Sequence, residues 1–296
     1  MSQPEIDLGK PQQHYRKHYL RNLPTAFCAG CGNGTILNCF IRAIDELLEV
    51  KKIQQQDLLC VSGIGCSAWI PSPHFNGDTL HTTHGRAIAF ATGAKTMNPN
   101  LLVTVFTGDG DGAAIGGNHL IHAARRNIPM TVVLVNNLNY GMTGGQSAPT
   151  TPLHVRTSTY AKHPEPPFDL CQLALGAGAS FVARWTTFYV DEITTTLKTA
   201  LLHPGFAFVE IISQCPTYAA RFLTEFQASL SAPEREQYQR YPGAWMLKAL
   251  KGKKIGEAFG QPRYQVKMKD VPVELGIFKQ EQRSTFIEYL RELWER

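Results

Sequence analysis

The sequence lacks any long hydrophobic run, and its most apolar stretches, such as Met130–Val135, are far too short to cross a bilayer. The first twenty residues, MSQPEIDLGKPQQHYRKHYL, are polar and lack the apolar core of a secretory signal. We therefore expect a cytoplasmic protein that does not enter the membrane.

Little excess charge is present, since 29 Lys and Arg stand against 24 Asp and Glu, for a net charge of +5. Basic residues gather between Arg240 and Lys269, which is typical of a solvated face, although docking of an acidic protein would use the same pattern. No nucleic-acid-binding motif accompanies this cluster, so we expect no nucleic-acid partner.

The seven cysteines are odd in number and so cannot all pair within one chain: Cys28, Cys31, Cys39, Cys60, Cys66, Cys171 and Cys215. In a reducing compartment they are expected to be thiols, metal ligands or catalytic groups rather than disulfides. Cys39, Cys60 and Cys171 have apolar neighbours, where cysteine is usually a small core residue.

Strands and helices alternate along most of the chain. Apolar periodicity predicts helices at 33–50, 86–96, 113–126, 168–175 and 191–202, and strands at 58–61, 101–106, 130–135, 181–184 and 206–212. This alternation predicts an α/β fold with a doubly wound parallel sheet, which binds ligands at the carboxyl ends of its strands.

The 296 residues, 43% of them hydrophobic, suit one large domain with an extension. We place the domain at 20–218 and the extension at 219–296, which we expect to be charged and helical without alternating strands. The segment 136–167 has weak periodicity, and a loop of that length inside a compact domain is usually functional or disordered.

Two polar motifs follow neighbouring predicted strands. Phe106–Gly112 reads FTGDGDG, and Asn136 and Asn137 end the next strand. Magnesium prefers oxygens of carboxylates, amides and carbonyls, while glycines and a helix N-terminus let the backbone approach a diphosphate. The pattern predicts a magnesium and diphosphate site; the alternative is a plain Gly/Asp turn with an Asn cap.

Four cysteines lie in short segments that suit an iron–sulfur cluster. FCAGCGNG holds Cys28 and Cys31 at the start of a helix, whereas GIGCS and SQCPTY place Cys66 and Cys215 at strand ends. A 4Fe-4S cluster needs four thiolates converging from short loops. A structural zinc site would show a second close Cys/His pair, and a thioredoxin-like redox pair would leave Cys66 and Cys215 unexplained.

The motifs CAGCGNG, GIGCS, HTTHGRAIAFATG, GDGDG…NN and QCPT, taken in this order, resemble the beta subunit of the 2-oxoacid:ferredoxin oxidoreductases from about Phe27 to Thr217. GDG followed by NN also resembles the diphosphate-binding motif of thiamine enzymes. The resemblance implies thiamine diphosphate, Mg²⁺ and a 4Fe-4S cluster as cofactors, held on the thiamine diphosphate-binding fold.

The resemblance also implies a role for individual residues, though it assigns no catalytic side chain. Magnesium would be bound by the side chains of Asp109 and Asn137 and by the carbonyl of Asn139. The cluster would be bound by Cys28, Cys31, Cys66 and Cys215. Thiamine diphosphate would be contacted by Ile64, Gly65, Cys66, Ser67, His84, Gly108, Gly110, Asp111, Gly141 and Met142.

The activity implied is coenzyme A-dependent oxidative decarboxylation of a 2-oxoacid, in which the thiazolium ring is the electron sink and electrons pass through the cluster to ferredoxin. The motifs CAGCGNG, HTTHGRAIAFATG and GMTGGQSAPTTP most resemble those of 2-oxoglutarate-type subunits, whose enzymes form succinyl-CoA. Pyruvate or another 2-oxoacid is the alternative substrate. Only one diphosphate motif is found, so an alpha subunit is expected to supply the other half of the site, in a heterotetramer.

Other functions stay open at this point. A non-redox thiamine-dependent decarboxylase or carboligase has no use for four converging cysteines, and an iron–sulfur electron carrier has none for the magnesium motif. A cysteine-ligated zinc binding module is a third alternative. His81 and His84 could bind zinc, but no further histidine or carboxylate follows in a recognisable pattern, so we expect His84 near the cofactor and leave His81 unassigned.

Overall fold

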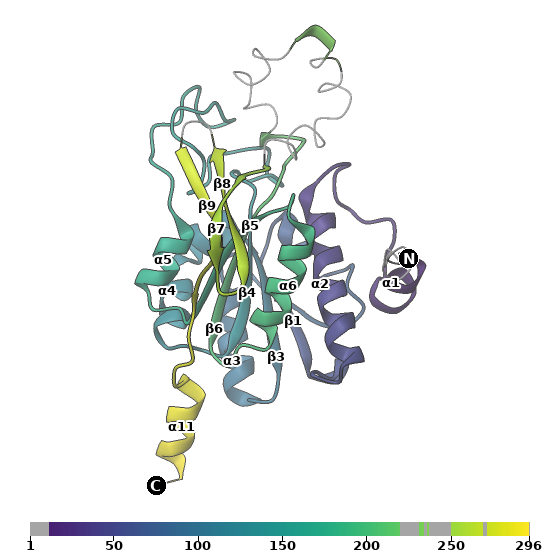
Figure 1. Cartoon of the computed structure of the whole chain (residues 1–296), viewed down its shortest axis with the longest axis vertical. Coiled ribbons are helices and arrows are strands. Elements are labelled where there is room, and N and C mark those ends of the chain that lie inside the picture. The colour runs from purple at the N-terminus through teal and green to yellow at the C-terminus, as the bar shows by residue number, and fades with distance from the viewer. Residues whose placement is uncertain (1–11, 220–230, 234–235, 237–249, 269–270, 296) are drawn as a thin grey trace, which may run out of the picture.

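The computed structural model describes residues 12–219, 231–233, 236, 250–268 and 271–295. Within them a nine-stranded sheet has the order β2-β1-β3-β4-β6-β5-β9-β8-β7 (Figure 1). Six strands are parallel: β1 (Leu58–Ser62), β2 (Asp78–His81), β3 (Leu102–Gly108), β4 (Met130–Asn136), β5 (Phe181–Thr186) and β6 (Phe206–Ile212). Three antiparallel strands continue the sheet beyond β5: β7 (Lys253–Ala258), β8 (Gln261–Met268) and β9 (Val271–Gln280).

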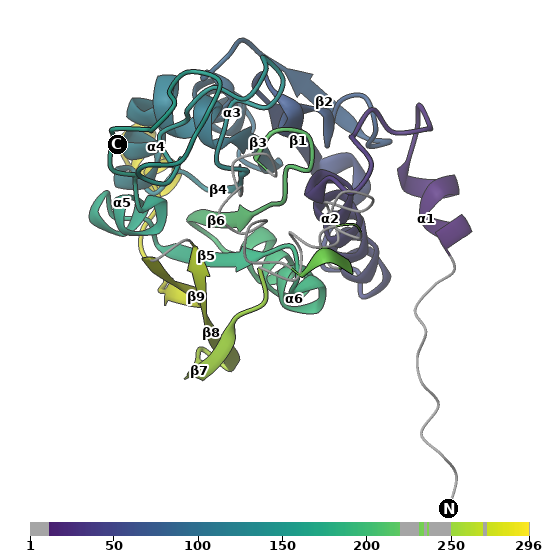
Figure 2. The same cartoon turned by 90° about the horizontal axis from the view of Figure 1, so that it is seen from above.

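Helices cover both faces of the parallel strands (Figures 1 and 2). One face carries α2 (Gly32–Glu49) and α6 (Val190–Leu201), and the other carries α3 (Ala87–Met97), α4 (Gly117–Arg125) and α5 (Leu170–Gly176). Along β4, Val133 and Val135 join the core under α2 and α6, while Val132 and Leu134 join the core under the other helices, because strand side chains alternate in direction. The predicted doubly wound parallel sheet is confirmed.

Several short elements complete the described chain. The helix α1 (Gln12–Tyr19) packs beside α2, and the 3₁₀ turns η1 (Gln55–Asp57) and η2 (Cys66–Trp69) flank β1. At the other end, α11 (Phe286–Trp294) begins with a capping box between Thr285 and Glu288. No helix in the described ranges is long and apolar enough to cross a membrane.

The helix predicted at 113–126 is divided in two. A π-helical turn, η3 (Gly110–Ile115), comes first, and the N–H of Gly116 donates to the carbonyl of Asp111, five residues back, at 3.0 Å. The α-helical part, α4, begins only at Gly117. Single π turns of this kind commonly occur at functional sites, and this one directly follows the GDG motif.

The expectation that residues after 219 are helical without strands is wrong for β7–β9. The strand β9 pairs with β5 and so covers what would otherwise be an exposed sheet edge, while Val266, Leu275 and Ile277 join the core beneath α2 and α6. Sequence periodicity gave little sign of β7, which is almost wholly exposed, or of β8, in which a single side chain is buried; β9 does alternate, with Val271, Val273, Leu275 and Ile277 at every second position. The division at residue 218 stays a prediction.

Candidate functional site

A pocket of about 260 Å³ lies at the carboxyl ends of β1, β3 and β4. All ten residues predicted to contact the cofactor lie in its lining: Ile64, Gly65, Cys66, Ser67, His84, Gly108, Gly110, Asp111, Gly141 and Met142. The three residues predicted to bind magnesium line the same pocket: Asp109, Asn137 and Asn139. The fold thus brings these segments together, because the carboxyl ends of neighbouring parallel strands share one edge of the sheet.

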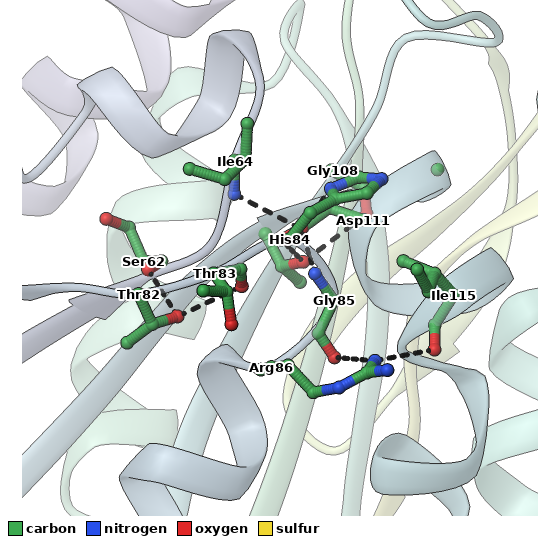
Figure 3. Close-up of polar contacts among 12 residues, drawn as sticks. Ser62, Ile64, Thr82, Thr83, His84, Gly85, Arg86, Gly108, Asp111 and Ile115 are labelled. Carbon is green, nitrogen blue, oxygen red and sulfur yellow. Dashed lines mark hydrogen bonds and ion pairs between the residues drawn. The ribbon is translucent and has the colours of Figure 1, made fainter.

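Asp111 ties three of these segments together (Figure 3). Its Oδ1 accepts hydrogen bonds from the backbone N–H groups of Gly85 at 2.6 Å and Ile64 at 3.2 Å, and its Oδ2 accepts one from the Thr107 hydroxyl at 2.6 Å. His84 Nδ1 lies 2.8 Å from the same Oδ1, at ion-pair distance but out of line for a hydrogen bond. Because the carboxylate is engaged by the protein, a contact of Asp111 with a diphosphate would have to come from its backbone.

Close packing around this carboxylate explains the first glycine of the SGIGCS motif, Gly63. A Cβ atom on Gly63 would lie 2.1 Å from Asp111 Oδ2, so no larger residue fits without moving the carboxylate. Gly110 is similarly confined, since a Cβ there would lie 2.2 Å from the Tyr140 ring. The two glycines therefore let the loop after β1 and the loop after β4 close on the GDG turn.

Three oxygen atoms converge on one side of the pocket. The side-chain oxygen of Asn137 lies 3.3 Å from Asp109 Oδ1 and 2.6 Å from the carbonyl oxygen of Asn139. With the amide rotated by half a turn, its nitrogen donates to both acceptors and the contacts are satisfied without a cation; with the oxygen in place, the three atoms would form a ligand set that suits a hard cation. Asn139 Oδ1 is also buried without a hydrogen-bond partner.

Asp109 is buried deeply beside this oxygen group. Its Oδ1 accepts from the N–H of Gly110 at 3.0 Å, and its Oδ2 accepts from the Thr150 hydroxyl at 2.5 Å. Burial raises the pKa of Asp109 to about 7, against the pull of these two hydrogen bonds. A buried carboxylate whose charge is poorly compensated by the protein is suited to a bound cation.

The four candidate cluster cysteines come from three segments that meet near the carboxyl end of β6. The N–H of Cys31 donates to the carbonyl of Cys28 at 3.0 Å, which closes the CAGC turn before α2. The N–H of Gly32 donates to the carbonyl of Gln214 at 3.2 Å, which attaches that turn to the segment of Cys215. The third segment contributes Cys66, at the start of η2.

The thiols of this group influence one another. Burial, together with the smaller effect of neighbouring cysteine thiols, raises the pKa of Cys31 to about 12 and that of Cys66 to about 11. A Cβ atom on Gly141 would lie 3.4 Å from Cys66 Sγ, so this thiol also borders the oxygen-rich pocket. The cysteine group and the pocket are therefore adjacent, with Cys66 between them.

The remaining cysteines and histidines lie elsewhere. Cys39, Cys60 and Cys171 are buried within α2, β1 and α5, and all seven cysteines of the chain are free thiols. His81 is exposed, bonds to Ser62 Oγ at 2.9 Å, and is absent from the pocket lining. Within the described residues, no three side chains of His, Cys, Asp or Glu are close enough to share a single metal ion.

Sequence reasoning missed two polar contributors to the pocket. Thr150 bonds to Asp109, and Tyr140 lines the pocket over Gly110. Both lie in the long segment after β4, in which the sequence GMTGGQSAPTTP contributes to the family resemblance but predicts no contact with Asp109. The two adjacent threonines in that stretch were the available signal, but only the folded loop shows which oxygen each hydroxyl reaches.

Residues 63–211 match the family model described as the thiamine pyrophosphate enzyme C-terminal TPP-binding domain. The matched segment runs from the end of β1 into β6 and contains the whole oxygen-rich pocket. The fold and the site thus define a thiamine diphosphate-binding domain.

Relatives narrow this class. The 2-oxoglutarate synthase subunit KorB of Methanocaldococcus jannaschii is 52% identical over 213 residues, which cover 71% of this chain and 77% of that protein. The subunit of the same name from Archaeoglobus fulgidus is 45% identical over 280 residues, covering 93% and 92%. The chain belongs to the beta subunits of the 2-oxoacid:ferredoxin oxidoreductases, which the resemblance had implied.

A solved structure agrees with this assignment. The 2-oxoglutarate:ferredoxin oxidoreductase from Magnetococcus marinus, with 2-oxoglutarate, coenzyme A and succinyl-CoA bound, superposes with a TM-score of 0.74. The sequences are 31% identical, and the match covers 99% of this chain and 92% of the other. The antiparallel strands β7–β9 therefore fall within the part of the chain that this relative matches.

Proposed function

We propose that this chain binds thiamine diphosphate through Mg²⁺ and carries a 4Fe-4S cluster. Together with an alpha subunit it catalyses coenzyme A-dependent oxidative decarboxylation of 2-oxoglutarate to succinyl-CoA and passes electrons to ferredoxin. One observation carries the proposal: the oxygen atoms of Asp109, Asn137 and Asn139, which suit a cation, lie next to the four candidate cluster cysteines, and Cys66 borders both sites. An electron acceptor placed beside a thiamine site is what an oxidative decarboxylase needs and a non-redox one does not.

The oxygen group fits magnesium. An octahedral Mg²⁺ with ligand distances near 2.1 Å separates adjacent ligands by about 2.9 Å. The spacings of 2.6 and 3.3 Å around the Asn137 oxygen lie on either side of that value. In the proposed site Asp109 and Asn137 bind through their side chains and Asn139 through its carbonyl, while diphosphate and water would complete the shell.

The thiol group fits an iron–sulfur cluster in another way. In a cubane each thiolate binds a different iron, so the four sulfur atoms stand further apart than the ligands of one zinc ion. The described residues hold no three such ligands around a single point, yet Cys28, Cys31, Cys66 and Cys215 are close enough to interact. Thiols with raised pKa values are protonated before the metal binds and must be deprotonated to bind iron, so cluster assembly would release protons to the solvent.

Thiamine diphosphate would supply the electron sink on which the carboxylate leaves as carbon dioxide. Gly110 and Gly141 would allow the backbone to approach the diphosphate, and η3 would offer N–H groups to it. His84, kept at the pocket by Asp111, would present its imidazole to the cofactor. The low accessibility of Asp109 and Asn139 would shield the cation from bulk solvent.

The proposed substrate follows the relatives, which are named as 2-oxoglutarate synthase subunits. The proposed partners are an alpha subunit and a ferredoxin in the cytoplasm. The alpha subunit would cover the aminopyrimidine end of the cofactor and contribute contacts to coenzyme A and the 2-oxoacid. Met142 and Ile64, apolar side chains at the pocket rim that are 46% and 39% exposed, suit such a covering surface.

The test is to co-express this chain with its alpha subunit, purify the complex without oxygen, and follow viologen reduction. We expect fastest turnover with 2-oxoglutarate, in strict dependence on coenzyme A, thiamine diphosphate and Mg²⁺. Faster reduction with pyruvate would overturn the substrate assignment. Carbon dioxide release from an iron-free complex, without dye reduction, would instead indicate a non-redox decarboxylase.

A further inference from the structure

The segment between β4 and α5, residues 137–169, folds back over the pocket that it helps to form. It has no helix or strand of its own, yet Thr150 and Thr151 are 3% and 0% exposed. Neither hydroxyl faces solvent; each donates to an oxygen in one of the two segments that supply the proposed cation ligands. Two adjacent buried hydroxyl groups aimed at different motifs require an explanation beyond filling space.

Thr150 acts on the GDG motif. Its Oγ1 donates to Asp109 Oδ2 at 2.5 Å, a short bond of the kind that a hydroxyl makes to a carboxylate. The other carboxylate oxygen, Oδ1, accepts from the N–H of Gly110 and is the one near the Asn137 side chain. The hydroxyl therefore determines which way the carboxylate plane is turned and which oxygen faces the ligand group.

Thr151 acts on the NN motif. Its Oγ1 donates to the carbonyl of Leu138 at 2.7 Å. Leu138 has φ of 65°, a left-handed conformation that a leucine rarely adopts and that lies between the two proposed ligands Asn137 and Asn139. The hydrogen bond holds the carbonyl of the residue at which the backbone reverses, and so supports the turn that directs both ligands into the pocket.

The two threonines are themselves held rigidly. The N–H of Thr151 donates to the carbonyl of Ala148 at 3.0 Å, and the N–H of Ala148 donates back to Thr151 Oγ1 at 2.8 Å. The carbonyl of Pro149 accepts from Phe168 at 2.8 Å, which ties the turn to the end of the segment. Since Thr151 Oγ1 accepts one hydrogen bond and donates another, its hydroxyl proton has a defined direction.

We propose that Thr150 and Thr151 are positioning residues for the magnesium ligands, Thr150 by orienting Asp109 and Thr151 by holding the turn at Leu138. The inference rests on the proposed function, because it concerns the same cation site. It adds a role for the long segment after β4: the segment clamps the two ligand-bearing motifs to each other. Metal affinity would then depend on residues that do not touch the metal.

The test measures the Mg²⁺ concentration that gives half-saturation of thiamine diphosphate binding, by calorimetry on the purified two-subunit complex. Thr150→Val keeps the shape and removes the hydroxyl, Thr150→Ser keeps the hydroxyl, and Thr150→Ala gives a second hydroxyl-free variant without added volume. Thr199→Val, on the exposed face of α6, is the matched control for the same chemical change. Thermal unfolding of each metal-free variant is recorded alongside.

We expect Thr150→Val and Thr150→Ala to raise the required Mg²⁺ concentration roughly 10- to 100-fold, which is the usual effect of removing a residue that hydrogen-bonds to a metal ligand. Thr150→Ser and Thr199→Val should stay within about twofold of the unmodified complex, and Thr151→Val should also raise the requirement. An unchanged requirement in both hydroxyl-free variants, or an equal rise in Thr150→Ser, would overturn the inference. If the unmodified complex shows no Mg²⁺-dependent binding at all, the proposed function fails instead.

Discussion

Two aspartates of the FTGDGDG motif, Asp109 and Asp111, line the same pocket and differ in what surrounds them. The carboxylate of Asp111 is occupied by Gly85, Ile64 and Thr107 and keeps the loops in place. Asp109 receives fewer hydrogen bonds, has its pKa raised by burial, and faces the oxygens of the NN turn. Asp111 therefore stabilises the loops of the pocket, whereas the carboxylate of Asp109 is available to bind a cation.

We predict that Asp109→Ala abolishes Mg²⁺-dependent binding of thiamine diphosphate. The loss of cofactor affinity should exceed the roughly 10- to 100-fold effect expected for the Thr150 variants, since an apolar side chain cannot replace a carboxylate ligand. Calorimetry at varied Mg²⁺ measures it, with Asn137→Ala as a parallel variant. Unchanged cofactor affinity in both would show that the motif is only a turn.

A second residue-scale prediction concerns the thiols. Serine at position 28, 31, 66 or 215 should remove the brown chromophore of anaerobically purified protein, because each thiolate binds its own iron. Cys39→Ser and Cys171→Ser are matched controls from buried positions in α2 and α5, and should retain iron. Equal loss of iron from either control would contradict the assignment of the four ligands.

At the scale of elements, β4, β5, β6 and α5 are joined by a buried polar chain. Arg184 Nε donates to Glu210 Oε2 at 2.6 Å and its guanidinium also pairs with Asp169, the N-cap of α5. The other oxygen of Glu210 accepts from Asn136 Nδ2 at 2.7 Å, directly before the proposed ligand Asn137. Arg184 and Glu210 are 6% and 2% exposed, so the buried charge of Glu210 depends on Arg184 for compensation.

Arg184→Met should lower the free energy of unfolding by about 3–5 kcal/mol, the usual cost of leaving a buried charge without its partner. Adding Glu210→Gln should recover part of this loss, since glutamine can still accept from Asn136 and carries no charge. Urea unfolding of the metal-free protein measures both. If the double variant were less stable than the sum of the single changes, the ion pair would not be the cause.

The strands β7–β9 give another prediction at this scale. A chain ending at residue 218 would expose the edge of β5 and lose the core contributions of Val266, Leu275 and Ile277. We therefore expect the fragment 20–218 to aggregate or to unfold at a much lower temperature than the whole chain. A monomeric fragment with an unchanged melting temperature would show that this region is a dispensable extension.

At the scale of the whole molecule, the oxygen-rich pocket lies at the carboxyl edge of the parallel strands. The pocket is formed by the ends of β1, β3 and β4 and adjoins the cysteine group that meets at the end of β6. In the proposed enzyme the diphosphate lies in this chain and the aminopyrimidine end in an alpha subunit. Each active site then requires both chains, and two copies of each give a symmetric assembly.

We predict that the chain purified alone does not reduce viologen dye with 2-oxoglutarate or pyruvate and coenzyme A, and that adding the alpha subunit restores turnover. The separate chain should still contain iron, because all four proposed cysteine ligands belong to it. Iron content of the isolated chain is therefore the control for correct assembly. Full turnover by the iron-loaded chain alone would refute the shared active site.

Much of the fold was predictable because it depends on local periodicity. Strand segments such as Met130–Val135 and the helical spacing of 33–50 place their elements within one or two residues of the structure. The strands β7 and β8 were hard to predict, since β7 is almost wholly exposed and β8 buries a single side chain. The strand β9 alternates apolar residues, but its place in the sheet is specified by the edge of β5. The π turn at Gly110–Ile115 was likewise missed, because it depends on packing around Asp111.

By itself the sequence predicted which residues would carry the chemistry: the motifs GDG, NN, CAGCG, GIGCS and QCP contain the residues that the fold brings to the pocket and to the four neighbouring cysteines. Only the tertiary structure decided how they divide the work. In the folded chain the Asp111 carboxylate bonds to the loops, whereas the Asp109 carboxylate faces the oxygens of Asn137 and Asn139. The fold also places Cys66 between the pocket and the other cysteines, and brings Thr150 to Asp109 across 41 positions of the chain. The reason is that residue type limits what a side chain can bind, whereas its neighbours in space determine which of its atoms remain available.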